Sequence, residues 1–208
     1  MFYLHPYQIK TKKIGTDKLL QHYQLGERDF SRVNLTQALL NDFNLIDIKL
    51  WQANLAEINL GRTILRRANL SESNLKGATL WRADLRQASL MKAQCSHAFF
   101  IRANLQQANL YKTKFVRAEM RLAYLSKADL QGADLSEANL SYADLSSANL
   151  RGANLNRTIL TGANLSQANL SHTNLGEAII EGANLNNAML PNLKMTNSTL
   201  QAAVPTYG

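Results

Sequence analysis

Residues 128–152 read ADLQG ADLSE ANLSY ADLSS ANLRG, five successive copies of one five-residue unit. The same phase runs from Phe30 to Leu200, where every fifth residue is a buried-type side chain and 28 of the 35 positions are Leu. The residue two places earlier is Ala in 23 of the 35 units, and the residue between them is Asn or Asp in 20. A fixed period of this kind identifies a repeat architecture.

The period of five is incompatible with the two ordinary secondary structures. On an α-helix five residues turn the chain by about 140°, so the Leu residues would spiral around every side. On a flat strand five is odd, so successive Leu residues would alternate between the two faces. A chain that bends once per unit instead keeps Ala and Leu pointing inward and Asn or Asp pointing outward, with the last two residues forming a corner.

The positions of glycine and proline in the repeat are those expected for a corner at its last two residues. All seven Gly residues between Phe30 and Leu200 occupy the two corner positions, which predicts a permissive backbone at both. Gly61 and Gly176 stand in the first corner position, and Gly77, Gly132, Gly152, Gly162 and Gly182 in the second. Pro is absent between residues 7 and 190, as expected where every backbone N–H pairs with an adjacent coil. The fold class predicted is an all-β solenoid.

Ala128–Gly132 (ADLQG) and Ala133–Glu137 (ADLSE) match the A(D/N)Lxx consensus of the pentapeptide repeat family, which the chain resembles over about four fifths of its length. The resemblance implies a right-handed quadrilateral β-helix with four pentads per coil. The 35 pentads then make about nine coils, and a spacing of about 4.8 Å gives a rod roughly 40 Å long.

The chain divides into three predicted regions: an N-terminal arm and capping helix over residues 1–29, the β-helix over 30–200, and a C-terminal tail or cap over 201–208. Residues 1–13 are expected to form a loosely docked or disordered arm rather than a targeting leader, because no uninterrupted apolar core follows their charges. Residues 19–30 (LLQHYQLGERDF) resemble the leader that precedes many cyanobacterial pentapeptide repeats.

A short helix is expected before the repeats, because a solenoid end exposes unpaired backbone groups that need a cap. Asp17 is the predicted N-cap and Gly26 the predicted stop. The apolar residues expected to lie along this helix are Leu19, Leu20, Tyr23 and Leu25.

The first and last coils depart from the regular pattern. Large side chains replace Ala at the inward position of the first coils, where they would widen the coil or meet the helix: Val33, Phe43, Ile48 and Ile58. The far end is apolar over residues 189–195. Either the C-terminal tail folds over the last coil, or this end meets a second copy, as in the terminal homodimers known in the family.

Composition and motifs argue against catalysis. No segment of 18 or more apolar residues could span a membrane, and the single Cys95 occupies an inward position, which indicates a reduced core thiol and a cytoplasmic protein. The four His residues have no metal-site spacing, and neither a nucleophile–base pair nor a phosphate-binding glycine loop is present. We therefore expect no enzyme activity, no metal and no cofactor.

Charge is distributed unevenly along the chain. Residues 1–127 hold 20 Lys plus Arg against 9 Asp plus Glu, a net of +11, whereas residues 128–208 hold 3 against 6, a net of −3. With four pentads per coil, Arg62, Arg82 and Arg102 form a column. Like charges at such a spacing repel by up to about 1 kcal/mol per pair in water, and nothing in the repeat requires them.

The predicted partner-binding residues combine these arginines with apolar side chains at outward or corner positions. They are Arg62, Arg66, Arg67, Trp81, Arg82, Arg86, Phe99, Ile101 and Arg102, and further apolar residues on the same face are Leu122, Tyr142, Ile159 and Ile179. Arg beside Trp is typical of interaction surfaces, and a contiguous apolar patch needs an explanation. The alternative is that the arginines only solubilise the rod.

Two functions remain. The first is a non-catalytic scaffold or regulator that binds another protein through this basic and aromatic face. The second is a nucleic-acid-related role, by direct binding through the Arg columns or by the DNA mimicry through which some family members block topoisomerases. The net charge of +8 favours direct binding over mimicry.

Overall fold

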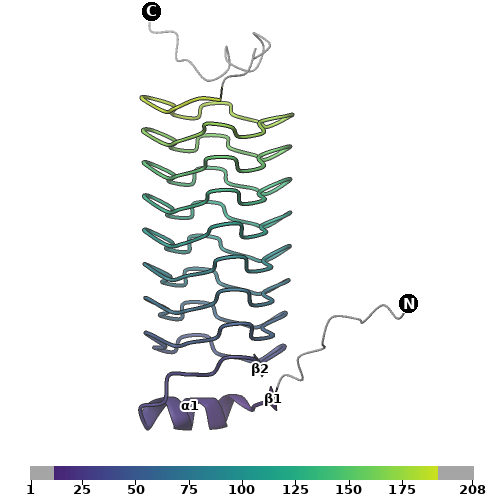
Figure 1. Ribbon diagram of the computed structural model, residues 1–208, viewed down its shortest axis with the longest axis vertical. Coiled ribbons are helices and arrows are strands. Elements are labelled where there is room, and N and C mark those ends of the chain that lie inside the picture. Colours follow the sequence, from purple (N-terminus) through teal and green to yellow (C-terminus); the bar gives the residue numbers. More distant parts are fainter. Residues whose placement is uncertain (1–11, 192–208) are drawn as a thin grey trace, which may run out of the picture.

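The computed structural model describes residues 12–191 and contains a stack of four-sided coils that rises from an N-terminal helix (Figure 1). The first residues of the predicted arm, 1–11, lie outside the described residues. So do the final repeats, 192–200, and the predicted tail, 201–208.

Three short elements precede the regular coils. Strand β1 (Lys12–Lys13) pairs directly and in parallel with β2 (Val33–Asn34). Helix α1 (Thr16–Gln24) connects the two strands in the sequence. Thereafter the sheet consists of parallel bridges between residues 20 apart, from Asp29–Lys49 to Asn169–Met189. This register places four pentads in each coil, as the family resemblance implies.

Each pentad makes one corner, which the unit Leu85–Ala88 illustrates. The N–H of Ala88 donates to the carbonyl of Leu85 at 3.0 Å, which closes a β-turn. The second corner residue, Gln87, has φ of 59°, in the left-handed region that a type II turn requires at its third position. Its N–H donates to the Gln106 carbonyl of the next coil at 3.1 Å.

The prediction of a permissive backbone is correct for only one corner position. The second position has positive φ throughout, both at Gly such as Gly132 (φ 65°) and at many non-glycine residues. The first position does not, so the expectation is wrong for Gly61 and Gly176. Their small size must serve another purpose.

The outward Asn or Asp stabilises the corner that follows it. In the pentad of Asp134, the side-chain Oδ1 accepts the backbone N–H of Ser136 at 3.2 Å and the amide of Asn154, one coil later, at 3.0 Å. The same bond from the first corner N–H recurs at most of the outward Asn and Asp residues. This local bond explains why the repeat prefers Asn and Asp at this position.

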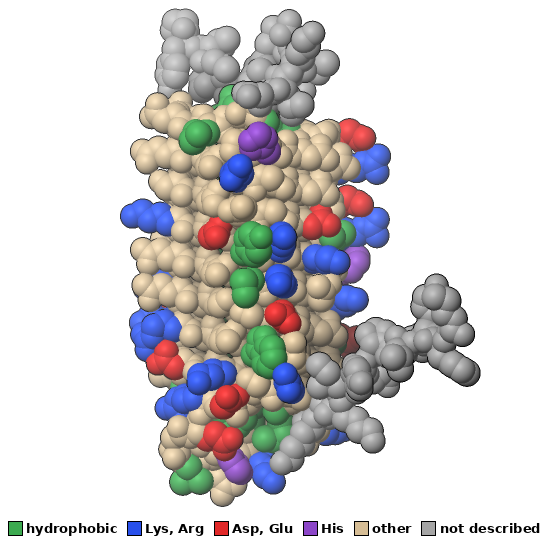
Figure 2. Space-filling view, viewed as in Figure 1, with side chains coloured by type: hydrophobic (Ala, Val, Ile, Leu, Met, Phe, Trp, Pro, Cys, Tyr) green, Lys and Arg blue, Asp and Glu red, His purple; other side chains and the backbone are tan. Residues whose placement is uncertain are grey.

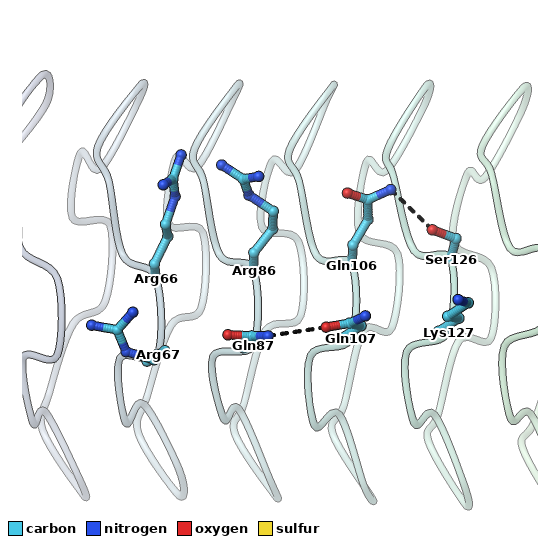
Figure 3. Close-up of a pocket in the computed structure, with 8 residues that line it drawn as sticks. All are labelled: Arg66, Arg67, Arg86, Gln87, Gln106, Gln107, Ser126 and Lys127. Atoms are coloured by element: carbon cyan, nitrogen blue, oxygen red, sulfur yellow. Dashed lines mark hydrogen bonds between the residues drawn. The ribbon is translucent and has the colours of Figure 1, made fainter.

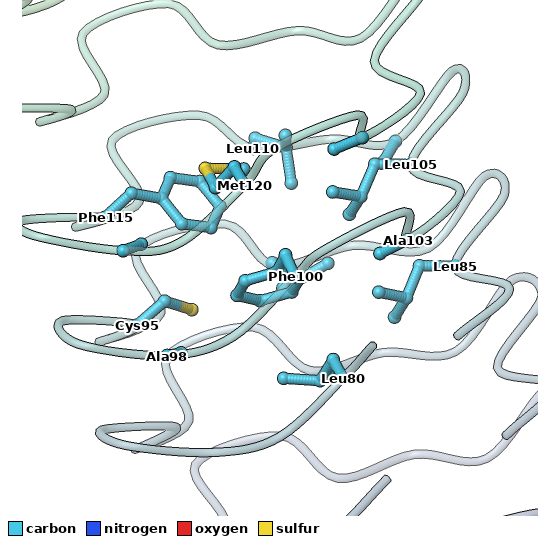
Figure 4. Packing of buried hydrophobic residues seen from close by; sticks show 14 of the residues in the cluster. Leu80, Leu85, Cys95, Ala98, Phe100, Ala103, Leu105, Leu110, Phe115 and Met120 are labelled. Carbon is cyan, nitrogen blue, oxygen red and sulfur yellow. The ribbon is translucent and has the colours of Figure 1, made fainter. Parts of the chain in front are cut away.

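The inward residues form one continuous core. Leu85 and Leu130 are fully buried, which confirms the inward orientation predicted from the period. Phe100 and Phe115 meet edge to face with ring centroids 5.5 Å apart, near Cys95, as Figure 4 shows. Cys95 is a free, fully buried thiol, and burial raises its pKa above the ordinary range.

The N-terminal helix exists, but its predicted details need correction. Its N-cap is Gly15, not Asp17, because β1 pairing holds the chain extended up to Ile14 and the helix begins directly afterwards. Asp17 instead places a negative charge in the first turn. Leu25 is 81% exposed at the C-cap, so its predicted position on the helix is also wrong, whereas Gly26 ends the helix with φ of 97°.

Helix α1 packs on the first coils. Leu19 is fully buried in the common core, and the Tyr23 hydroxyl donates to the Ile46 carbonyl at 2.8 Å. Ile48 and Ile58 point inward as expected, but Phe43 does not, since it is 40% exposed. The buried Thr63 holds the equivalent position one coil later, and a phenyl ring is far larger than the small side chains that fit there.

Candidate functional site

The predicted site residues lie along two neighbouring corners of the early coils. The N–H of Arg62 donates to the Trp81 carbonyl at 2.9 Å and that of Arg82 to the Ile101 carbonyl at 3.0 Å, which sets the arginine column in register. We define the Arg/Trp face as Arg62, Trp81, Arg82, Phe99, Ile101 and Arg102. Arg66, Arg67 and Arg86 belong to the next corner along the chain.

Gly61 makes room for Trp81 on this face. A Cβ built on Gly61 would collide with the indole Nε1 and lie 2.7 Å from Cδ1. The ring therefore lies against the coil below, and it is 37% exposed. The absent side chain of Gly61, rather than its backbone freedom, explains why glycine stands here.

Two guanidinium groups flank the indole of Trp81. The Cζ atoms of Arg62 and Arg82 lie 5.4 and 5.5 Å from the ring centroid, within cation–π range. Arg62 also pairs with Asp42, one coil earlier, with Nε and Oδ1 2.6 Å apart. The hydrogen bond from Arg62, followed by that from Asn41, lowers the pKa of Asp42 below its ordinary value.

The arginines of the next corner are also compensated. Arg67 pairs with Asp47 at 2.6 Å, and its hydrogen bond lowers the pKa of that carboxyl. Arg66 and Arg86, from successive coils, both donate to the Asp84 carboxylate, at 2.6 and 2.7 Å. Four arginines of the predicted set are thus paired with carboxylates, which offsets the like-charge repulsion expected from the sequence: Arg62, Arg66, Arg67 and Arg86.

The shared carboxylate of Asp84 is strongly acidic. Partial burial raises its pKa, but the hydrogen bonds from Arg86 and Arg66 outweigh this effect and hold the pKa at about 2. Beside this cluster lies a groove of about 450 Å³, shown in Figure 3. It is lined by Arg66, Arg67, Arg86, Gln87, Gln106, Gln107, Ser126 and Lys127.

Arg82 and Arg102 differ from the four arginines that pair with carboxylates. Among the described residues, neither has a carboxylate within 4 Å, and both side chains are exposed. Phe99, beside them, is 44% exposed. One view of the surface shows such apolar side chains scattered among charged ones along the rod (Figure 2).

Sequence reasoning missed several members of the site. Asp42 and Asp47 each stand 20 residues before the arginine that they neutralise, so a search for opposite charges at that spacing would have found both. Asp84 needed the structure, because it reaches Arg66 from 18 residues away. Tyr124 is a further exposed aromatic residue, 49% exposed. Its place at an outward position, normally held by Asn or Asp, was enough to predict this exposure from the sequence.

Residues 12–191 show no cluster of three or more His, Cys, Asp or Glu side chains that could hold a metal ion. Within the same range, no helix has the length and apolar character needed to cross a membrane.

The fold and surface are those of a β-solenoid built from five-residue repeats. The family model for pentapeptide repeats matches overlapping segments that together run from 29 to 204: 29–67, 44–82, 68–107, 103–141, 138–176 and 168–204. The chain belongs to the pentapeptide repeat family, and it adopts the right-handed quadrilateral β-helix of that family.

The solved structures that resemble this chain include HetL and QnrB1. HetL, a pentapeptide repeat protein involved in heterocyst differentiation regulation from the cyanobacterium Nostoc sp. strain PCC 7120, is 27% identical, with a TM-score of 0.59 over 86% of this chain and 98% of HetL. QnrB1, a plasmid-mediated fluoroquinolone resistance protein, is 15% identical, with a TM-score of 0.68 over 84% of this chain and 88% of that one, and shows the fold alone. No curated protein matches this chain.

Proposed function

We propose that this protein is a non-enzymatic binding protein with a regulatory role, and that it docks another protein through the Arg/Trp face. The observation that carries the proposal is the indole of Trp81, which is set into the space above Gly61 and flanked by two guanidinium groups. Trp and Arg are the residues most enriched among binding hot spots, and a side chain already fixed in place loses little entropy on binding.

The similarity to HetL supports a regulatory role. HetL is involved in the regulation of differentiation, and the similarity covers 98% of its length.

A matched pair of variants tests this function. Pull-downs from the native organism would compare Trp81→Ala with Trp51→Ala, because Trp51 also lies beside an arginine, Arg32 at 4.6 Å, but in a different corner column. We expect Trp81→Ala to lose a partner that wild type and Trp51→Ala retain. Recovery of every partner by Trp81→Ala would refute the proposal.

Direct nucleic-acid binding is the second candidate, favoured by the arginine column and the net charge of +8. The ion pairs with Asp42, Asp47 and Asp84 weaken it, because those carboxylates would repel phosphates. DNA mimicry is weaker still, since two of the few acids in the second half, Glu137 and Glu177, are paired with arginines. Affinity for duplex or single strands that falls steeply with salt would support direct binding.

We also propose that α1 caps the solenoid of about nine coils and that the protein is cytoplasmic. Leu19, buried in the core from α1, supports the cap, and the buried thiol of Cys95 is compatible with a reducing compartment. Fractionation of the native cells tests the location. Leu19→Asp should unfold the first coils and expose them to proteolysis, whereas Leu25→Asp should not.

A homodimer through the C-terminal end remains a prediction. Met189 and Leu190 are 61% and 38% exposed at the end of the described coils, and a second copy could cover them. The mass in solution of wild type and of Met189→Lys would test it: a dimer that the variant abolishes supports this contact, and a wild-type monomer excludes it.

A further inference from the structure

Arg82 and Arg102 break a rule that the other arginines of the same backbone position follow. Seven arginines occupy second corner positions in the described residues. Four of them pair with a carboxylate one coil away, at 2.6 to 2.9 Å: Arg62–Asp42, Arg67–Asp47, Arg117–Glu137 and Arg157–Glu177. Arg32 donates to the Gln52 amide oxygen at 3.2 Å. Within the described part of the chain, Arg82 and Arg102 have neither kind of partner, and they stand in one column on successive coils.

The molecule itself shows what satisfies two stacked arginines. Arg66 and Arg86 lie 20 residues apart in a neighbouring column, and the single carboxylate of Asp84 accepts from both, at 2.6 and 2.7 Å. Asp84 occupies the outward position of the pentad that carries Arg86. In the pentad that carries Arg102 the same position holds Phe99. Arg82 and Arg102 stand at the second corner, where four other arginines find a carboxylate at the same position one coil away. The positions that flank this pair hold Arg62 and Leu122 instead, and the outward residue beside Arg102 is an exposed phenyl ring.

A partly exposed aromatic residue stands in the same pentad as each of these two arginines. Trp81 rests in the space left by Gly61, with Arg82 5.5 Å from its ring centroid, and Phe99 is 44% exposed one coil later. A carboxylate held here would lie beside aromatic surface that excludes water, and exclusion of water strengthens a charge-assisted hydrogen bond.

We propose that Arg82 and Arg102 form an open clamp for one carboxylate side chain of a partner protein, and that an apolar residue next to this carboxylate packs on Trp81 and Phe99. The inference rests on the proposed protein-binding function and specifies the chemistry of the partner: an acidic segment with an aromatic or large aliphatic neighbour. The partner supplies to Arg82 and Arg102 what Asp84 supplies to Arg66 and Arg86 within the chain.

The charge balance favours such a segment over a nucleic acid. Proteins that follow a phosphate backbone neutralise about six to ten phosphates, whereas only two cations of this face lack a partner among the described residues. Asp42 lies one coil before Arg62 in the same column, and Asp84 lies in the pentad that follows Arg82, so both carboxylates would repel a polyanion that runs across the coils. A single carboxylate needs only the two guanidinium groups of this face that lack an acidic partner within residues 12–191.

The test uses a fluorescein-labelled synthetic octapeptide in which two glutamates flank one phenylalanine. We expect it to bind wild type and to lose at least about tenfold in affinity, or 1.4 kcal/mol, when its glutamates become glutamines. The double variant Arg82→Gln, Arg102→Gln should show the same loss. Arg117→Gln, Arg157→Gln is the matched control, because it removes the same two charges from the same backbone position on another corner, and it should bind within about twofold of wild type.

Three results would overturn the clamp. The first is an equal loss in both double variants, which would mean non-specific attraction. The second is absence of binding at about 1 mM peptide. The third is tighter binding of a single-stranded oligothymidylate that depends on Arg82 and Arg102, which would make the site a nucleic-acid site.

The clamp and the wider function can fail separately. If Trp81→Ala loses the native partner while the double variant Arg82→Gln, Arg102→Gln keeps it, the protein-binding face stands and the clamp is wrong. If the peptide depends on Arg82 and Arg102 while Trp81→Ala keeps every native partner, the two arginines bind carboxylates but the proposed protein-binding function of the face is wrong.

Discussion

The indole of Trp81 lies over Gly61, one coil earlier, in the space that any other residue would fill with its side chain. The two residues are 20 apart in sequence, so this contact exists only because four pentads close each coil. Glycine here fixes the orientation of an exposed aromatic residue, whereas glycine at the second corner position serves the backbone.

Gly61→Ala should therefore displace the Trp81 indole from the space over residue 61. Because the added methyl group would overlap the indole, we expect a loss of about 1–3 kcal/mol in the free energy of unfolding, measured by urea denaturation, together with a red shift of tryptophan emission in a Trp51→Phe background.

Gly176→Ala is the control for this variant. It is the other first-corner glycine, and the atoms nearest to its new Cβ would be the side-chain oxygens of Asn156 and Asn174, at 2.9 and 3.2 Å. It should leave the emission of Trp81 unchanged. An unshifted emission in Gly61→Ala would show that the position of the Trp81 ring does not depend on the absence of a side chain at residue 61.

The Asp84 carboxylate links Arg66 and Arg86 and should stabilise the protein in a defined pH range. Its folded pKa of about 2 lies below its ordinary value of 3.8, so the unfolded state binds the proton more readily. The stabilisation is then complete above the ordinary value and is lost as the pH falls toward 2.

Replacement of Asp84 by Asn should cost about 1 kcal/mol near neutral pH, since solvent screens part of the interaction. The difference from wild type should shrink as the pH falls from 4 to 2. Asp144→Asn is the control, because this aspartate accepts the equivalent corner N–H, from Ser146, without an arginine contact. A stability difference that is constant with pH would contradict the role of the carboxylate charge.

The period of five predicted the inward Leu and Ala positions, because these follow from a constant bend. The stacking of Arg62 on Arg82 also required four pentads per coil, which the family resemblance implied. The period did not predict the roles of Gly61 or Asp84. Those roles depend on which side chains meet across coils, and the five-residue unit does not by itself determine how many pentads make up each coil. The start of α1 at Thr16 was missed for a related reason, since the long-range pairing of β1 with β2 determines it.

Charge was the property least predictable from sequence. The halves of the chain differ in net charge, yet Arg62 and Arg67 are neutralised by acids 20 residues earlier. Like charges alone predict repulsion along the column, whereas the structure pairs Arg62 with Asp42. Among residues 12–191, Arg82 and Arg102 have no such acidic partner.

The second corner position should tolerate glycine better than the first. Lys127 has φ of 59°, which costs a non-glycine residue about 1–2 kcal/mol, so relief of this strain should offset the entropy that glycine gains in the unfolded chain. Gln131 stands at a first corner without positive φ, and glycine there should cost about 0.5–1 kcal/mol. We expect Lys127→Gly to be as stable as wild type or more so in urea denaturation, and Gln131→Gly to be less stable. The reverse order would contradict the assignment of strain to the second corner.

Cys95 and Phe115 occupy the same inward column on successive coils, and Phe115 meets Phe100 edge to face. We infer that the small Cys95 side chain leaves the volume that the phenyl rings need. Cys95→Leu should then overpack the core and Phe115→Leu should leave it underfilled, each at a cost of about 1–3 kcal/mol. The double variant restores the Leu-on-Leu stacking of the regular coils and should recover at least about 1 kcal/mol of the summed loss. Urea denaturation of the four proteins measures this coupling, and strictly additive losses would show that the two positions do not share volume.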